Sequence, residues 1–222
     1  MLNLITIIIL SYLVGSIPNS IIVSKSVAGI DIKSHGSGNA GGTNVMRILG
    51  WKYGLLVIIL DALKGAIAVV LISRLYLGSF PFPNATPFDD FTLVQIIAGF
   101  SAVIGHIWTV FSGFKGGKGI ATGVGVYMAL VTLDILLAIG VFALVVMISR
   151  YVSLGSILAA ISVPIIMIVR ENIFGVDIYG YHTLLPFSIL LTGLIVYAHR
   201  ENIKRLIAGK ENKLSFSKNK TK

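Results

Sequence analysis

Residues 111–125 hold the densest group of residues suited to anion chemistry. The stretch reads F-S-G-F-K-G-G-K-G-I-A-T-G-V-G and contains six glycines and two lysines. Glycine lets the backbone turn tightly, successive N–H groups in such a turn form a concavity for anions, and lysine adds a point charge. The stretch therefore predicts a phosphate site, with Lys118 close to a helix N-terminus that would also favour negative charge. The alternative is a glycine-rich membrane re-entry without a ligand.

This glycine loop differs from a nucleotide-binding P-loop. Lys118 is followed by Gly119 rather than Ser or Thr, and Ser112 stands where the first glycine of that motif is required. Nucleotide binding is therefore disfavoured.

A second polar segment, residues 31–47, has the same character. It places Ser37, Asn39 and Asn44 among glycines and ends in Arg47, whose planar guanidinium suits bidentate contact with phosphate. The alternative is a merely flexible loop.

A third segment begins at His199. In a helix, His199 and Asn202 would face the same way, and a histidine there can orient or polarise an alcohol. The alternative is an interfacial histidine ahead of a basic amphipathic tail. A smaller island at 150–156 adds the hydroxyl of Ser153.

Composition indicates the setting of these segments. The chain has 222 residues, of which 55% are apolar and 12% charged, and its mean hydropathy is +0.91, as in helical membrane proteins with several spans. It has no cysteine, which excludes disulfides and thiol chemistry. Eight of the 18 Lys and Arg lie in residues 200–222. Such a tail usually faces the cytoplasm and contacts anionic lipid, whereas nucleic acid is a poor partner for so apolar a chain.

Charge distribution predicts the topology. A span needs about 20 apolar residues, and the positively charged segments 24–52, 111–125, Arg150 and the tail should be cytoplasmic. Because the glycine loop and Arg150 are both placed inside, 120–149 must cross twice, turning near Asp134. We therefore expect an all-α polytopic protein with seven transmembrane helices, its N-terminus outside and its C-terminus cytoplasmic. The alternative is one long tilted helix over 120–149 and six crossings. The apolar segments are 2–23, 53–77, 92–111, 120–149, 152–169 and 183–197.

Asp61 and Lys64 are charged residues inside the second span. Their spacing allows them to pair on one helix face. Charges within a membrane are usually paired or functional, and we interpret this pair as structural.

Together these segments closely resemble the bacterial acyl-phosphate:glycerol-3-phosphate acyltransferases, the PlsY family. The family often has proline where this chain has Thr109, so the resemblance does not determine how the chain bends before the glycine loop. The matching stretches are Y-L-V-G-S-I-P at 12–18, G-S-G-N-x-G-x-T-N at 36–44 with Arg47, D-x-x-K-G at 61–65, G-H at 105–106, F-K-G-G-K-G-I-A-T at 114–122, R-Y-x-S at 150–153 and H-R-x-N-I-x-R-L at 199–206.

The resemblance implies a seven-helix membrane fold and transfer of an acyl group from acyl phosphate to the 1-hydroxyl of sn-glycerol 3-phosphate. The products would be lysophosphatidic acid and phosphate, in the first step of bacterial phospholipid synthesis. Because acyl phosphate is already activated, direct attack without an acyl-enzyme, cofactor or metal is the simplest hypothesis. The implied site residues are His199, Asn202 and Ser37 for catalysis, Arg47, Lys118, Ser153, Asn39 and Asn44 for phosphate binding, and Gly116, Gly117 and Gly119 for acyl phosphate.

The same interpretation places one domain, residues 1–222, in the bacterial inner membrane as a monomer, with the active site on the cytoplasmic face and a mobile basic tail at about 207–222. Two other functions fit the basic sites. A transporter or flippase for an organophosphate would often show internal repeats, which this chain lacks. A lipid-phosphate phosphatase would need a phosphate-accepting nucleophile or clustered metal ligands, which the acidic residues do not supply.

Overall fold

A computed structural model describes residues 2–78, 80 and 83–214, and this part of the chain is helical, with no strand. The helices are α1 (Leu2–Ser16), α2 (Asn19–Ala28), η1 (Ile32–Ser34), α3 (Gly42–Leu49), α4 (Trp51–Val70), η2 (Ile72–Leu75), α5 (Asp90–Ile107), η3 (Val110–Ser112), α6 (Ile120–Leu130), α7 (Thr132–Ser149), α8 (Val152–Asn172), α9 (Tyr181–Ala198) and α10 (Arg200–Ile207).

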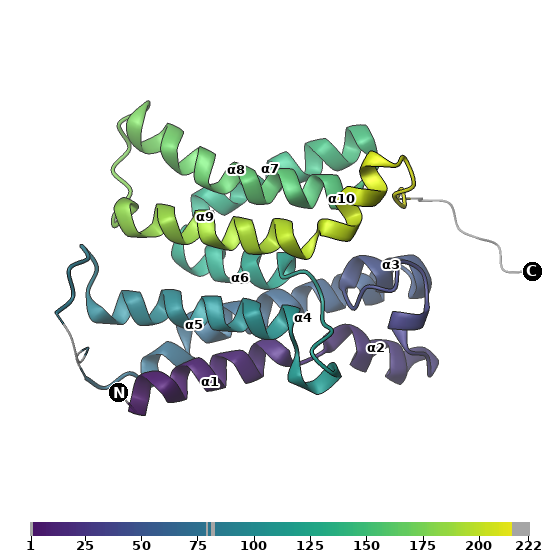
Figure 1. Ribbon diagram of the computed structural model, residues 1–222, viewed down its shortest axis with the longest axis horizontal. Helices are drawn as coiled ribbons and strands as arrows, with labels where there is room; N and C mark the ends of the chain where they lie inside the picture. The colour runs from purple at the N-terminus through teal and green to yellow at the C-terminus, as the bar shows by residue number, and fades with distance from the viewer. Residues whose placement is uncertain (1, 79, 81–82, 215–222) are drawn as a thin grey trace, which may run out of the picture.

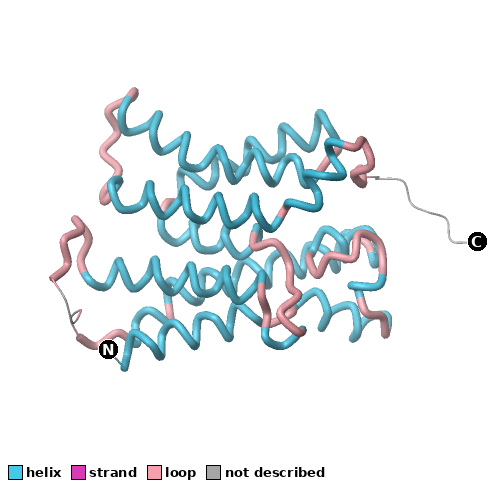
Figure 2. The backbone as a smooth tube through the Cα atoms, viewed as in Figure 1, coloured by secondary structure: helices cyan, strands magenta, loops and turns pink. Residues whose placement is uncertain are grey.

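The long helices pack side by side. Helix α1 packs on α5, α4 on α6, α7 on α8, and α8 on α9. In the view of Figure 1, α7, α8 and α9 form the upper part of the bundle, α1, α4 and α5 form the lower part, and α6 lies between them. The loops gather at the two ends of the bundle (Figure 2). The largest apolar core joins α5, α6, α8 and α9 through residues such as Val103, Val126, Met167 and Leu191.

Six segments of the described chain are long and apolar enough to span a membrane. They are Asn3–Ala28, Trp51–Leu75, Asp90–Ser112, Thr132–Ser149, Val152–Asn172 and Tyr181–Ala198. Helix α6 is apolar but has only 11 residues.

The predicted reversal within 120–149 is present, and the alternative of one long tilted helix is wrong. Helix α6 ends at Leu130, and Val131, with φ −143° and ψ 67°, separates it from α7. The chain therefore turns three residues before Asp134. The start of α6 and the end of α7 lie at the same end of the bundle, because Lys118 contacts Asn202 and the Arg150 carbonyl accepts from Leu214 N at 2.7 Å.

Helices α4 and α6 approach closely because a glycine of each helix lies against the backbone of the other helix. A Cβ at Gly65 would overlap the Thr122 carbonyl, and one at Gly125 would overlap the Ala62 carbonyl. Small residues commonly allow such contact between helices in membranes. This contact fixes α6 beside α4, so that residues of both helices reach one cavity.

The first apolar segment bends between α1 and α2, because Pro18 cannot continue the helical hydrogen bonds. Lys64 Nζ donates to the Ile17 carbonyl at 3.0 Å at this bend. Lys64 also pairs with Asp61 at 3.0 Å, and both side chains are buried. The two charges thus compensate each other inside the bundle.

The bend before the glycine loop forms without the proline common in the family. Thr109 Oγ1 donates to the Ser16 carbonyl at 2.5 Å, and the Thr109 carbonyl accepts from Phe114 N at 2.8 Å. Hydrogen bonds therefore hold the turn that a proline would otherwise stiffen.

Candidate active site

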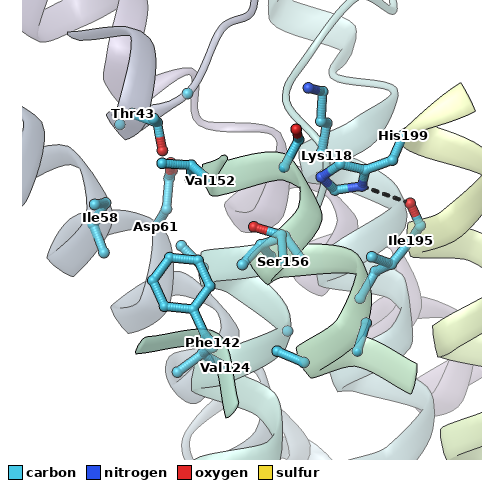
Figure 3. A pocket seen from close by; sticks show the side chains of 18 of the residues that line it. Thr43, Ile58, Asp61, Lys118, Val124, Phe142, Val152, Ser156, Ile195 and His199 are labelled. Atoms are coloured by element: carbon cyan, nitrogen blue, oxygen red, sulfur yellow. Dashed lines mark hydrogen bonds between the residues drawn. The ribbon is translucent and has the colours of Figure 1, made fainter. Parts of the chain in front are cut away.

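A cavity lies where the three polar segments meet α6, α7 and α8. It has a volume of about 360 Å³. Figure 3 shows Lys118 and His199 on one side and the Thr43 and Asp61 side chains on the other. Its polar lining comprises Ser37, Asn39, Thr43, Asn44, Arg47, Asp61, His106, Lys118, Tyr127, Ser153, Ser156, His199, Asn202 and Glu211. The segments that sequence patterns singled out therefore converge in space.

Five polar side chains form a connected network at the cationic end. Lys118 Nζ donates to Asn202 Oδ1, and Asn202 Nδ2 donates to Glu211 Oε1 at 2.8 Å. The same carboxylate oxygen accepts from Ser153 Oγ at 3.0 Å, and Arg205 Nε donates to Glu211 Oε2 at 2.8 Å. Ser153, Lys118 and Asn202 are thus held together although they lie on α8, the glycine loop and α10.

The side chain of His199 is oriented by the last turn of α9. Its Nδ1 lies 2.8 Å from the Ile195 carbonyl, which can only accept, so Nδ1 carries the proton. The pKa of His199 is lowered to about 4, chiefly by burial and also by the nearby Lys118 ammonium. The imidazole is therefore neutral near pH 7, and its unprotonated Nε2 can accept a hydrogen bond from an alcohol.

Two cations next to the cavity have few counter-charges. Burial lowers the pKa of Lys118 to about 8, helped by Arg205 and Arg47, while Glu211 opposes the shift. Burial also lowers the pKa of Arg47, whose NH2 group contacts the Asn212 carbonyl at 3.4 Å and whose buried Nε has no partner among the described residues. An anionic ligand would relieve this electrostatic strain.

The first polar segment folds around Asn44 at the start of α3. Asn44 Oδ1 accepts from Ser37 N at 2.9 Å, and its Nδ2 donates to the carbonyls of Ile32, His35 and Asn39 at 2.9–3.1 Å. Asn44 lines the cavity but is fully used in holding the loop. Ser37 and Asn39 also line the cavity.

In the structure the glycines of the second glycine motif lie beside the cavity and make backbone contacts with the end of α5. Gly116, Gly117 and Gly119 are not part of the cavity lining. The N–H groups of Gly116 and Gly117 donate to the carbonyls of Ile107 and His106, both at 3.0 Å, so they are not free to bind an anion. Gly119 precedes α6 with φ 82°, a conformation that favours glycine. These glycines shape the loop, whereas Lys118 and the first residues of α6 face the cavity.

Glu211 is a buried site residue to which sequence reasoning assigned no role. Burial raises the pKa of Glu211, but hydrogen bonds from Asn202, Arg205 and Ser153 outweigh burial and lower it overall. It belongs to the basic tail expected to be mobile at about 207–222. Residues 215–222 of that tail lie outside the described residues, whereas Glu211 contacts the site and Leu214 bonds to Arg150. The sequence signal that could have identified Glu211 is that it is the one acidic residue in this basic tail.

The other half of the cavity is apolar and extends away from the cations between α6, α7 and α8. Its walls include the small residues Ala138 and Ala160 and also Phe142, which is closer than Ala138 to the Arg150 end of α7. The apolar lining comprises Ile58, Val124, Ile135, Ala138, Ile139, Phe142, Val152, Ala159, Ala160, Val163 and Ile195. The cavity thus suits a ligand with an anionic head and a hydrocarbon tail.

No group of three or more His, Cys, Asp or Glu side chains that could hold a metal ion occurs in the described part of the chain. The fold and the site together define an integral membrane protein with a cavity that is cationic at one end and apolar at the other.

Comparison with known proteins gives the family. The family model for glycerol-3-phosphate acyltransferase matches residues 5–209. The chain is 46% identical to a glycerol-3-phosphate acyltransferase of Chlorobaculum tepidum, covering 98% of this chain and 99% of that one. It is 47% identical to one from Chlorobium phaeobacteroides, covering 97% and 98%.

Solved structures agree with this assignment. The glycerol 3-phosphate form of PlsY (YgiH), an integral membrane glycerol 3-phosphate acyltransferase, matches with a TM-score of 0.79 at 37% identity over 96% of both chains. Its lysophosphatidic acid form matches with a TM-score of 0.78 at 37% identity, over 96% of this chain and 95% of that one. The chain therefore belongs to the glycerol-3-phosphate acyltransferase family of PlsY type.

Proposed function

We propose that this protein transfers an acyl group from acyl phosphate to the 1-hydroxyl of sn-glycerol 3-phosphate, giving lysophosphatidic acid and phosphate. The observation that carries the proposal is the single cavity that joins a cationic end to an apolar end. The donor needs both, since it has a phosphate head and an acyl tail. The acceptor needs only the cationic end. Glycerol 3-phosphate and lysophosphatidic acid name the two forms of the similar PlsY structure, which supports this pair of acceptor and product.

The cations hold the phosphates in this proposal. Arg47 and Lys118 supply charge, and Ser37, Asn39 and Ser153 supply neutral donors at the same end of the cavity. The first residues of α6 line the cavity beside Lys118, so the free N–H groups of this helix N-terminus add further donors. Such fixed donors stabilise the charge that develops during acyl transfer.

The chemical step is a direct acyl transfer. The hydroxyl oxygen of glycerol 3-phosphate attacks the carbonyl carbon of the acyl phosphate, a new ester C–O bond forms, and the bond between that carbon and the phosphate oxygen breaks. The departing phosphate takes the hydroxyl proton. Neutral His199 accepts the hydrogen bond of the hydroxyl through Nε2, Asn202 fixes Lys118 beside it, and holding both substrates in place supplies much of the rate. No residue becomes acylated.

For the membrane arrangement we propose seven crossings, with α6 as the short seventh, the N-terminus outside and the C-terminus cytoplasmic. Positive residues support this orientation, because Lys33, Arg47, Lys118, Arg150 and Arg205 lie at the cavity end and Lys33 Nζ even donates to Ser112 Oγ of the glycine loop at 2.8 Å. Cytoplasmic ends carry such an excess. The active site of this monomer would then face the cytoplasm of a bacterial inner membrane.

Phosphate release from the purified protein tests the function. With palmitoyl phosphate and sn-glycerol 3-phosphate together we expect release of phosphate and an equal amount of lysophosphatidic acid, and with palmitoyl phosphate alone we expect none. Release without the acceptor would indicate a phosphatase. No release with both substrates, in folded protein, would favour the transporter. A trapped acyl-enzyme would contradict direct attack.

A further inference from the structure

His106, in the last turn of α5, is a buried residue that contacts the glycine loop through both its backbone and its side chain. Its carbonyl accepts from Gly117 N at 3.0 Å. A Cβ at Gly117 would overlap Nε2 of the imidazole, so the ring lies directly against the Gly117 backbone. His106 also lines the cavity, but the reaction described above gives it no role.

The opposite side of the imidazole is supported by charges inside the bundle. His106 Nδ1 lies 3.7 Å from Asp61 Oδ1 and makes no shorter hydrogen bond within the described residues. Asp61 Oδ1 is itself fixed by Asn19 Nδ2 and Lys64 Nζ, each at 3.0 Å. The ring thus rests on a polar group that joins α4 to the bend between α1 and α2.

The first polar segment also lies against the Cβ side of Gly117. A Cβ at Gly117 would lie 2.9 Å from the Ala40 carbonyl oxygen. The side of Gly117 that would carry a side chain is therefore closed by both the imidazole of His106 and the backbone of Ala40. The next residue is Lys118, whose ammonium bonds to Asn202 in the cavity.

We propose that His106 is a positioning residue for Lys118: through its contact with Gly117, the imidazole fixes the point from which the lysine enters the cavity. The proposal rests on the function proposed above. A lysine side chain is long and flexible, so its ammonium is preorganised only if its backbone is held. A displacement of about 1 Å near a reacting group can lower a rate by about 100-fold.

Two substitutions separate this role from a purely structural one. In His106→Asn the amide can replace Nδ1 opposite Asp61 but leaves space beneath Gly117. In His106→Gln the amide extends toward the position of Nε2 but gives up the group that faces Asp61. We expect His106→Asn to lower kcat/KM by about 10- to 100-fold and His106→Gln to retain most of it, with both variants folded. The reverse order would overturn the proposal.

A double-mutant cycle with Lys118→Ala gives the second readout. If His106 acts through Lys118, His106→Asn should lower kcat/KM by less than about threefold once the lysine is gone, since coupled residues give non-additive effects. Losses that multiply would overturn the proposal. Thermal unfolding of all four proteins checks that the variants are folded.

If His106→Asn proves unstable, Gly117→Ala disturbs the same contact from the side of the glycine, because its Cβ would overlap the imidazole. The same cycle with Lys118→Ala then applies, and independent losses overturn the proposal. The wild-type protein separates the two ideas: absent turnover would refute the proposed function, whereas normal turnover with additive effects would refute only the role of His106.

Discussion

At the end of the bundle away from the main cavity, Asp134 and Arg170 form an ion pair of 2.7 Å. At the cavity end, Arg47, Lys118 and Arg205 surround one buried carboxylate, Glu211, while the nearby Asp61 is already paired with Lys64. Both ends bury charge, but only one leaves cations in excess. A compensated pair is weak grounds for function, since such pairs also occur as structural elements. The excess of cations is what indicates an anionic ligand.

The largest effect should come from removing a cation of the cavity end. Lys118→Ala should lower kcat/KM by about 100-fold, because hydrogen bonds to charged groups contribute about 1.5–3 kcal/mol and about 1.4 kcal/mol corresponds to a tenfold change. Steady-state kinetics with palmitoyl phosphate measures this. Lys115→Ala is the matched control, since Lys115 is exposed in the same loop and not part of the cavity lining. Equal losses in both variants would contradict the site.

Neutralising Glu211, the carboxylate among the cations, should have a smaller effect than removing Lys118. Glu211→Gln should lower kcat/KM by about 10- to 30-fold, because an amide NH₂ would replace the oxygen that accepts from Arg205 while Ser153 and Asn202 keep an acceptor. The same kinetic assay measures the loss. An unchanged value would show that Glu211 does not organise the site.

The apolar half of the cavity can be tested by filling it. Ala160→Phe should raise the KM for palmitoyl phosphate by about tenfold and that for octanoyl phosphate by less than about twofold, because a large side chain in a packed site shortens the space left for the tail. Ile165→Phe, on the exposed face of the same helix, is the control. The same change for both chain lengths would argue against an acyl chain there.

The pH dependence of the reaction reports the charge on Lys118. The amine binds phosphate only when protonated, and its pKa is lowered to about 8. We therefore expect the titration of Lys118 to leave kcat/KM independent of pH below about pH 8 and to lower it by up to tenfold per pH unit above about pH 8. Lys118→Arg should abolish this alkaline decline, since arginine stays protonated, although its different geometry will change the absolute rate. An identical decline in Lys118→Arg would assign it to another group.

The smallest effect on catalysis should come from disrupting the Asp134–Arg170 ion pair at the end of the bundle away from the cavity. Arg170→Ala leaves the buried Asp134 carboxylate without its partner, so it should lower the free energy of unfolding by about 2–3 kcal/mol, somewhat less than for a fully buried pair. The KM values for both substrates should remain within about twofold. Thermal unfolding and steady-state kinetics measure the two effects. A large rise in either KM would show that the end away from the cavity also affects substrate binding, and would contradict the difference between the two ends.

Much of this site could be predicted from residue types. The density of glycine and positive charge between apolar segments located the three loops, and the positions of Lys and Arg required the chain to reverse within 120–149. That reversal occurs at Val131. Its exact position could not be predicted, because no glycine or proline marks the end of α6 at Leu130.

Other features depend on tertiary contacts that no local pattern encodes. Gly116 and Gly117 look like anion-binding glycines, but their N–H groups are taken by the end of α5. Glu211 looks like part of a solvated tail, but it folds back to accept hydrogen bonds from Ser153 and Asn202. In both cases a long-range partner decides the role, and sequence spacing says nothing about that partner.

The wall of the cavity has a consequence for how turnover should be measured. Ile139 lines the cavity and is 37% exposed, so the apolar half of the cavity is not fully closed off by buried side chains. A donor that enters there is drawn from a two-dimensional phase. Its effective concentration is the mole fraction in the bilayer or micelle, so adding detergent at constant bulk substrate would dilute the donor and leave the water-soluble acceptor unaffected.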